Sequence, residues 1–370
     1  FDGVTDAPPF EGFTVGSGGK DITISNTTGL VIRAIDHSAG DQLFIIGSSD
    51  NTKIVDCTLN YFDPDAGEME LVDSTVNGRI SQDGGSLYTT NVNIGDDFDT
   101  TGSAVRTIAF RTTVADECNW KSVRSWFGYS NAARFVFNRS NAKVVIVGST
   151  IELSEASYHG IQLYGGGNHY TVVNSIVKNV GLNSSYQRDQ QCIRIEDNIN
   201  CDITIQNNYL HGYSTGIGDQ RGVNHPIYIE DYTTGIQVAN NIFLNGRDSM
   251  IYAPFGATVL NNHVFNGNSG VEGGVTQMYT TTGDPLFVDD DPYQLGEGSP
   301  CINAGTEDPR YNDRDGSRND IGPSGGAWYD PDGWTTENPV VISFELSKDQ
   351  ILEGDSTPLL LQEGLGVSIP

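Results

Sequence analysis

Two glutamates and one arginine in the middle of the chain are residue types that could do acid–base chemistry together. Glu196 ends the segment QQCIRIE at 190–196, and Glu230 ends NHPIYIE at 224–230. If these segments are neighbouring parallel strands, the two carboxylates lie about 5 Å apart. Carboxylates at that distance repel one another unless a cation or a bound proton relieves the repulsion.

Three arrangements would relieve this repulsion, and the sequence leaves all three open. Arg194 could neutralise both carboxylates in a structural network. A Ca²⁺ ion could bridge Glu196 and Glu230, because Ca²⁺ prefers several oxygen ligands. One carboxyl group could instead stay protonated as a general acid, as in glycosidases that use a carboxylate pair. The acidic neighbours available to a Ca²⁺ ion are Asp189, Asp197 and Asp231.

Aromatic and basic residues around the pair favour a polysaccharide ligand. Aromatic rings pack on sugar rings, and arginine binds carboxylates and sulfates. Elimination from a uronate needs a base, a cation that neutralises the carboxylate, and an acid. His225 or Tyr228 could be the base, with Arg194 or Arg221 as the cation. The predicted sugar-binding residues are Tyr164, Tyr252, Arg188, Arg221 and Arg247.

The segments that must position these residues share an apolar residue at every second position. This alternation is typical of a strand with one buried face. The shared pattern aligns 158–164, 190–196, 224–230 and 248–254, and we expect 107–111 and 134–138 in the same register. The alignment predicts one outward column of Gln162, Arg194, Tyr228 and Tyr252, a second of Tyr164, Glu196 and Glu230, and a corner column of His159, Gln191, His225 and Ser249.

A second repeated feature is a pair of asparagines after the strand that follows each segment. Asn208 and Asn241 are 33 residues apart, and Asn262 comes 21 residues later. A repeat of about 20–35 residues that holds only short strands indicates a solenoid. Inward asparagines at the corners of such a fold can form a ladder of amides, which pairs backbone groups that a tight bend exposes.

Composition excludes several classes of function. Asp and Glu outnumber Lys and Arg by 48 to 20, and the net charge of −28 disfavours nucleic acid as a partner. No apolar run approaches the roughly 18–20 residues that a membrane-spanning helix needs. We expect no organic cofactor, and Ca²⁺ is the one cofactor that the acidic pair suggests.

The five cysteines form no CxxC pair and no zinc-binding spacing. Cys57 and Cys118 replace a small polar residue of the repeat, which predicts buried stacking positions. Cys192 and Cys201 are close enough in the sequence for a local disulfide to be proposed.

The repeats resemble a known fold family. V-x-N-N-x-F motifs after a Gly-Ile or Pro-Ile strand are similar to right-handed parallel β-helix proteins of the pectate-lyase-like superfamily, over residues 10–325. The run DPLFVD at 284–289, with YQL at 293–295, GSPCINAG at 298–305 and DIG at 320–322, resembles the closing segment of many secreted bacterial β-helix proteins. The resemblance implies an extracellular, all-β parallel β-helix and names no substrate, because this superfamily hosts many activities.

We therefore expect β-helix coils over 1–283, a C-terminal cap over 284–337 and a short strand-like tail over 338–370, with strands at 340–346 and 351–361. The cap would cover the open edge at the end of the stack. The longer loops at 181–189 and 211–224 would flank a groove.

Two functions follow as hypotheses. The first is a secreted or particle-surface β-helix that engages an acidic polysaccharide, as a lyase or glycosidase. The chain carries no match to the E-x-I-S-x-K-S segment of alginate and chondroitin lyases, to the pectate-lyase histidine motif or to the Y-G-F-D-P motif of epimerases. The alternative is a structural or adhesive β-helix such as a phage tailspike, a virion decoration protein or a surface appendage subunit. Such a protein would be a homo-oligomer, for example a trimer, through the solenoid face or the tail.

Overall fold

The structure is a computed structural model. It describes the chain except for residues 1–9, 13, 15–20, 39–42, 48–49, 154–158, 180–190, 197–199, 213–224, 231–234, 247–248, 290, 330–339, 347–360 and 368–370. The described part is all-β apart from one 3₁₀ turn at Pro309–Tyr311. No helix among the described residues has the length and hydropathy that crossing a bilayer requires. The chain forms two compact units, Phe1–Tyr329 and Asp330–Pro370.

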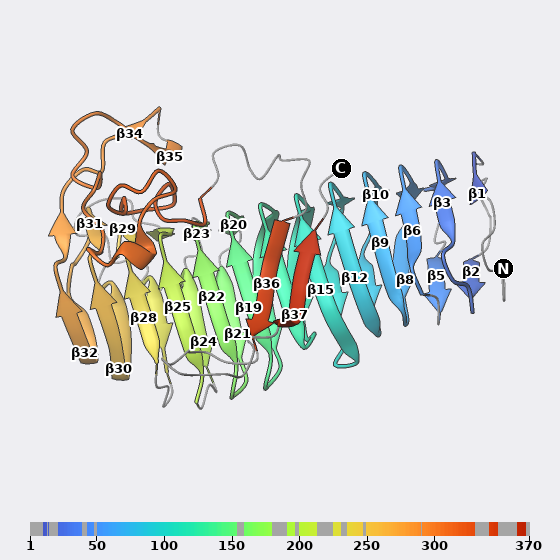
Figure 1. Cartoon of the computed structure of the whole chain (residues 1–370), viewed down its shortest axis with the longest axis horizontal. Coiled ribbons are helices and arrows are strands. Elements are labelled where there is room, and N and C mark those ends of the chain that lie inside the picture. Colours follow the sequence, from blue (N-terminus) through green and yellow to red (C-terminus); the bar gives the residue numbers. More distant parts are fainter. Residues whose placement is uncertain are drawn as a thin grey trace, which may run out of the picture. The chain divides into compact units, whose positions relative to one another are not determined.

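The first unit is a parallel β-helix, as expected (Figure 1). Its strands stack in three columns, which we call faces A, B and C, and every pairing within a column is parallel. Face A contains β4 (Asp36–His37), β7 (Thr58–Leu59), β10 (Thr75–Val76), β13 (Asn93–Ile94), the starts of β16 (Thr113–Trp120) and β18 (Asn131–Asn138), β20 (Thr150–Leu153), β23 (Ile176–Asn179), β26 (Tyr209–Gly212), β29 (Ile242–Leu244), β31 (His263–Phe265) and β33 (Thr281–Thr282).

Faces B and C complete each coil. Face B contains β2 (Ile22–Ser25), β5 (Leu43–Gly47), β8 (Tyr61–Pro64), β11 (Ile80–Gln82), β14 (Phe98–Thr100), the ends of β16 and β18, β21 (Ile161–Tyr164), β24 (Ile193–Glu196), β27 (Ile227–Ile229) and the starts of β30 (Ile251–Leu260) and β32 (Val271–Met278). Face C contains β1 (Phe10–Glu11), β3 (Val31–Arg33), β6 (Thr52–Val55), β9 (Glu68–Val72), β12 (Gly85–Thr90), β15 (Ala104–Phe110), β17 (Arg124–Gly128), β19 (Lys143–Val147), β22 (His169–Val173), β25 (Asp202–Gln206), β28 (Ile236–Ala239) and the ends of β30 and β32.

The core consists of the inward residue of each strand stacked on its counterpart in the next coil. Ile161, Ile193, Ile227 and Ile251 form one such row, and all four are completely buried. Burial of a side chain of this size contributes about 1.5–3 kcal/mol, so repetition of the coil supplies the stability of the fold. The predicted period of two is confirmed for these strands.

The two asparagines of each pair have different roles at the corner between faces C and A. The second asparagine of each pair points inward and forms the predicted amide ladder. The Asn208 backbone N–H donates to Asn241 Oδ1 at 2.9 Å, and the Asn241 N–H donates to Asn262 Oδ1 at the same distance. In earlier coils a serine takes this place, since the Cys57 N–H donates to Ser74 Oγ at 3.1 Å.

The first asparagine of each pair adopts a left-handed backbone conformation and binds the C-terminal segment. Asn207 Nδ2 donates to the carbonyl of Asp320, and Asn174, which precedes Ser175 at the equivalent corner, donates through Nδ2 to the carbonyls of Pro323 and Gly325. These bonds run along the side of several coils, whereas the sequence suggested a cap across the end of the stack. Segment 284–329 thus belongs to the same compact unit as the coils.

Two predictions from the sequence are wrong. Segment 107–111 lies largely in β15 on face C, with Ala109 opposite Phe127, and not in the face B register. Cys192 and Cys201 form no disulfide: all five cysteines lie within the described residues as buried thiols. Cys201 instead donates to the Gly165 carbonyl at 3.4 Å, inside the core. The predicted buried positions of Cys57 and Cys118 are confirmed.

The second unit is a pair of antiparallel strands, β36 (Val340–Leu346) and β37 (Leu361–Val367). The strand predicted at 340–346 is confirmed. Most of the one predicted at 351–361 lies outside the described residues, and β37 begins only at Leu361.

Candidate functional site

Face B presents the predicted columns of polar and aromatic side chains. Arg194 lies opposite Gln162 on one side and Tyr228 on the other, and Tyr228 lies opposite Tyr252. In the second column, Tyr164 lies opposite Glu196. Glu230 directly follows β27, and its N–H donates to the carbonyl of Ile195, the neighbour of Glu196, at 3.0 Å. Glu196 and Glu230 therefore occupy consecutive coils on one face.

Arg194 neutralises part of the charge of this pair. Its Nε forms an ion pair with Glu196 Oε1, and its Nη2 lies 3.1 Å from Glu230 Oε2. Burial alone would lower the pKa of Arg194. The hydrogen bond to Glu196 and the charges of both carboxylates outweigh that effect and raise the pKa above its usual value, so the guanidinium stays charged. These ion pairs are the contacts that the first predicted arrangement, the structural network, requires.

The network continues toward earlier coils. Gln162 Nε2 donates to Glu196 Oε1 at 3.0 Å and also to the Tyr164 hydroxyl. Gln162 Oε1 in turn accepts from Arg134, whose Nη1 lies 2.6 Å from Glu117 Oε2. An unbroken row of donors and acceptors thus runs from β16 to the residue after β27, with each side chain held by its neighbours.

The aromatic residues extend this row toward later coils. The rings of Tyr228 and Tyr252 are stacked, with centroids 4.7 Å apart and planes 9° from parallel. The guanidinium carbon of Arg194 lies 5.1 Å from the Tyr228 centroid. Since Arg194 and Tyr252 lie one coil before and one coil after Tyr228, both faces of that ring are covered. A ligand would meet the edge and hydroxyl of Tyr228 and not an open ring face.

Two histidines lie at the corner that precedes these strands. His225 Nδ1 shares a 2.7 Å hydrogen bond with Ser249 Oγ, and the His225 ring centroid is 5.4 Å from that of Tyr252. His159 Nδ1 accepts from the Gln191 N–H at 3.1 Å. Burial, aided by the positive charge of nearby arginines, lowers the pKa of His159 to about 3. The predicted corner column is therefore confirmed as a set of positions.

The remaining predicted site residues, and most of the two predicted flanking loops, lie outside the described residues. These site residues are Arg188, Arg221, Arg247, Asp189, Asp197 and Asp231.

Acidic clusters that the sequence analysis missed lie elsewhere in the described part of the chain. One contains Asp63, Asp65 and Asp83, and the other contains Asp96, Asp97 and Asp116. Burial, with the charges of its two neighbours, raises the pKa of Asp63 to about 6. Asp65 and Asp83 are 18 residues apart, the offset that also pairs Phe62 with Ile80. A sequence separation equal to the coil length is therefore the signal that could have revealed this cluster.

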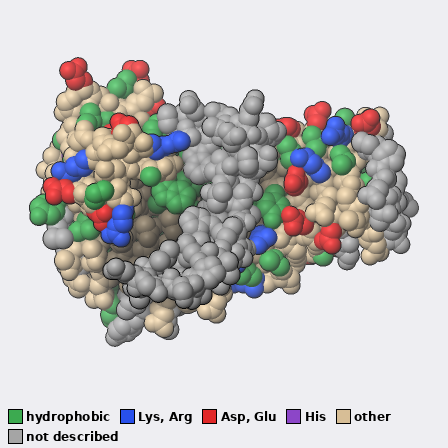
Figure 2. All heavy atoms as spheres, viewed as in Figure 1, with side chains coloured by type: hydrophobic (Ala, Val, Ile, Leu, Met, Phe, Trp, Pro, Cys, Tyr) green, Lys and Arg blue, Asp and Glu red, His purple; other side chains and the backbone are tan. Residues whose placement is uncertain are grey.

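Face C, which Figure 2 shows from the front, is a mixed charged surface. On its N-terminal half, Asp and Glu side chains are interspersed with Lys and Arg. Lys53 Nζ, for example, lies 3.0 Å from Glu70 Oε2, and both side chains are about half exposed. Such exposed pairs are typical of a solvated surface and contribute little stability.

No family model, no curated protein and no solved structure matches this chain. The fold assignment therefore rests on the strand register, and any function must be argued from the site.

Proposed function

We propose that this protein is an extracellular β-helix of the pectate-lyase-like type that binds a polysaccharide along face B, centred on Arg194, Tyr228 and Tyr252. The observation that carries the proposal is the hydrogen-bonded row from Glu117 to Glu230, which continues into the stacked tyrosines. Its side chains are held in place in the unbound protein. Binding would therefore cost less side-chain entropy than it would on a surface of mobile side chains.

The charges of the row favour a neutral polysaccharide. Arg194 supplies one positive charge against the two carboxylates of Glu196 and Glu230. The whole chain carries −28, so a polyanionic glycan would be repelled unless Ca²⁺ intervened. Sugar hydroxyls, in contrast, can both donate to the carboxylates and accept from the guanidinium. The acidic glycan expected from the sequence is accordingly the comparison ligand in the test.

The geometry supports binding more strongly than cleavage. The side chains of Glu196 and Glu230 are both paired with Arg194 and belong to the fixed row. His225, the predicted base, is nine-tenths buried, and its Nδ1 is hydrogen-bonded to Ser249 Oγ and not open to a substrate. Binding without cleavage is what an adhesive β-helix does, so the adhesive alternative uses this same surface.

The proposal can be tested with a panel of immobilised polysaccharides. The panel should contain neutral glucans and galactans beside alginate, pectate, ulvan and carrageenan, each with and without CaCl₂. We expect retention on at least one neutral polymer, and Tyr252→Ala should weaken the binding about tenfold. The matched control is Tyr88→Ala, which removes a half-buried tyrosine from β12 on face C.

Two results would contradict the proposal. One is retention on none of these polymers. The other is equal binding by the wild type and Tyr252→Ala. An assay for new reducing ends and for unsaturated products on each bound polymer separates an adhesive protein from a glycosidase or a lyase.

A further inference from the structure

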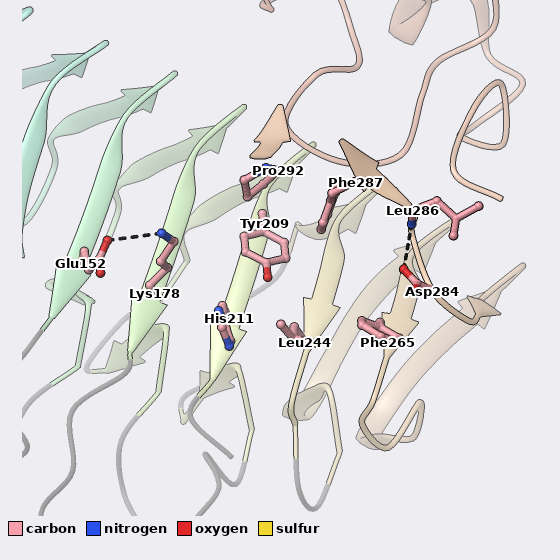
Figure 3. A pocket seen from close by; sticks show the side chains of 10 residues that line it. All are labelled: Glu152, Lys178, Tyr209, His211, Leu244, Phe265, Asp284, Leu286, Phe287 and Pro292. Carbon is pink, nitrogen blue, oxygen red and sulfur yellow. Dashed lines mark hydrogen bonds and ion pairs between the residues drawn. The ribbon is translucent and has the colours of Figure 1, made fainter. Parts of the chain in front are cut away.

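A cavity of about 620 Å³ lies on face A, on a different side of the coils from the row described above. Five strands of face A form its floor, and residues that follow β33 form its roof (Figure 3). Its volume is within the range of about 300–1,000 Å³ that is typical of small-ligand sites. The lining residues are Glu152, Lys178, Tyr209, His211, Leu244, Phe265, Asp284, Leu286, Phe287 and Pro292.

The floor changes from charged to apolar along the solenoid axis. Glu152, Lys178, His211, Leu244 and Phe265 occupy equivalent positions in five successive coils. With about 4.8 Å per coil, the four steps from Glu152 to Phe265 span about 19 Å. One end of the cavity therefore offers hydrogen-bonding groups, and the other offers aliphatic and aromatic carbon.

The polar end is held in a defined state. Lys178 Nζ lies 3.3 Å from Glu152 Oε2. His211 Nε2 and Asn245 Nδ2 are 3.2 Å apart, with the amide as donor. Burial, with a smaller effect of the Lys178 charge, lowers the pKa of His211 to about 4, so this ring is neutral at pH 7.

The charges around the cavity disfavour an anion. With His211 neutral, Lys178 is the one cation among the ten lining residues, and Glu152 and Asp284 are its two carboxylates. A carboxylate or sulfate ligand would add a further negative charge to a site with a net charge of −1.

The apolar end comes from the floor and the roof together. The rings of Tyr209 and Phe287 meet edge to face, with centroids 5.4 Å apart. Figure 3 shows Leu244 and Phe265 side by side on the floor below Phe287. The roof also contributes Leu286, whose side chain is 42% exposed even though its N–H is anchored to Asp284 Oδ1 at 2.9 Å. The apolar wall that a ligand would meet is therefore formed by Leu244, Phe265 and Phe287.

From this arrangement we propose that the cavity binds one neutral 6-deoxyhexose, either free or as a residue of a glycan. Its hydroxyls would face Lys178 and His211, and its methyl group would face Leu244, since Lys178 and Leu244 are two coils apart, about 10 Å. A parent hexose would place its 6-hydroxyl against the apolar wall, where the hydroxyl loses its hydrogen bonds to water. A uronic acid would be repelled by the carboxylates. This inference names a sugar for a separate face, so it can fail while binding on face B stands.

The test uses methyl glycosides that differ by one group. Methyl α-L-fucoside and methyl α-L-galactoside differ only in the 6-hydroxyl, and methyl α-L-rhamnoside and methyl α-L-mannoside form a second such pair. Binding to the full chain is measured by saturation-transfer NMR and by calorimetric titration. In at least one pair we expect the deoxy sugar to bind about tenfold more tightly than its parent. Methyl galacturonide is expected not to bind.

Variants locate the binding. Leu244→Trp fills the apolar end, and Lys178→Ala removes a hydrogen-bonding group; both should abolish or weaken deoxy-sugar binding at least fivefold. Tyr252→Ala, on face B, should leave it unchanged, and Leu244→Trp should leave polysaccharide retention unchanged. Circular dichroism and thermal unfolding check that each variant is folded. The proposal is overturned if neither deoxy sugar binds, if the parents or the uronide bind as tightly, or if both pocket variants bind normally.

Discussion

Arg194 and Glu230 lie on consecutive coils of face B, and their side chains form an ion pair with a separation of 3.1 Å. The same guanidinium pairs with Glu196, so one cation separates two carboxylates that the coil spacing would otherwise bring together. The side chains of Arg194 and Glu196 are only about one-fifth exposed, whereas that of Glu230 is 46% exposed. The pair therefore lies between a surface ion pair and a buried one.

Replacing Arg194 by Met should destabilise the protein through repulsion between Glu196 and Glu230. We expect the free energy of unfolding at low salt to fall by about 1–2 kcal/mol, less than for a fully buried pair because Glu230 is in contact with solvent. Urea denaturation followed by circular dichroism measures the change. The loss should shrink as NaCl is added, because salt screens the repulsion.

The double variant Arg194→Met/Glu230→Gln is the control for this explanation. It removes one of the two repelling charges, so it should regain part of the lost stability. Millimolar CaCl₂ should stabilise Arg194→Met more than the wild type, because the freed carboxylates can then ligate a cation. If Arg194→Met unfolds at the same urea concentration as the wild type at low salt, the ion pairs contribute nothing measurable.

His159 should make stability fall as the solution is acidified. Its pKa in the folded protein, about 3, lies below the ordinary 6.5 because of burial and then of Arg194 and Arg134. The unfolded chain therefore binds the proton first. The contribution of His159 to stability is complete above pH 6.5 and is lost as the pH falls toward 3.

The variant His159→Asn tests this pH dependence. An asparagine oxygen can accept the Gln191 N–H in place of Nδ1, but it does not titrate. Between pH 6.5 and pH 5 the variant should lose less unfolding free energy than the wild type, measured by urea denaturation at each pH. An equal slope for His159→Asn and the wild type would refute the assignment.

Much of face B could be predicted because equivalent strands keep the same alternation. Ile161, Ile193, Ile227 and Ile251 fall in one row as expected. The same reasoning failed for 107–111, since every coil has three strands with a period of two. Alternation reveals which side of a strand is buried but not which face of the coil the strand belongs to.

The details of the site depend on side-chain conformations that no pattern encodes. Nothing in the sequence decides whether Arg194 or a bound ion separates the glutamates, or that Arg194 covers a face of Tyr228. The cavity on face A could have been found in part. Lys178, His211, Leu244 and Phe265 each come three residues after the inward residue of the ladder. The roof of the cavity comes from the segment after β33, whose position over face A no repeat predicts.

Asn241 should be among the most sensitive positions in the ladder. Its side chain is completely buried, donates to the Ile205 carbonyl and to Asn262 Oδ1, and accepts from Asn208. Asn241→Leu leaves these groups without partners, and we expect a loss of about 3 kcal/mol or more in urea denaturation. Asn241→Ser, the residue type found at the equivalent position 175, should lose less. A leucine variant as stable as the wild type would show that the ladder is dispensable.

The Asn207 side chain should hold the C-terminal segment in place without contributing to the stability of the coils. The backbone φ of this residue, 52°, is left-handed, a conformation that glycine adopts without strain. Its Nδ2 donates to the carbonyls of Asp320 and Gly322 at 2.8 and 3.1 Å and to Asn319 Oδ1 at 3.0 Å. Asn207→Gly therefore keeps the corner and removes the bonds to the segment.

Hydrogen exchange read by mass spectrometry can separate these two roles. In Asn207→Gly we expect faster exchange over residues 303–325 and unchanged exchange in β25 and β26, because local opening follows the loss of local contacts. Asn91→Gly is the matched control. Asn91 has the same left-handed backbone, but its side chain donates to Asp73 on the neighbouring coil. If Asn207→Gly speeds exchange in β25 and β26 as much as in 303–325, Asn207 supports the coil itself and the C-terminal segment is held by other contacts.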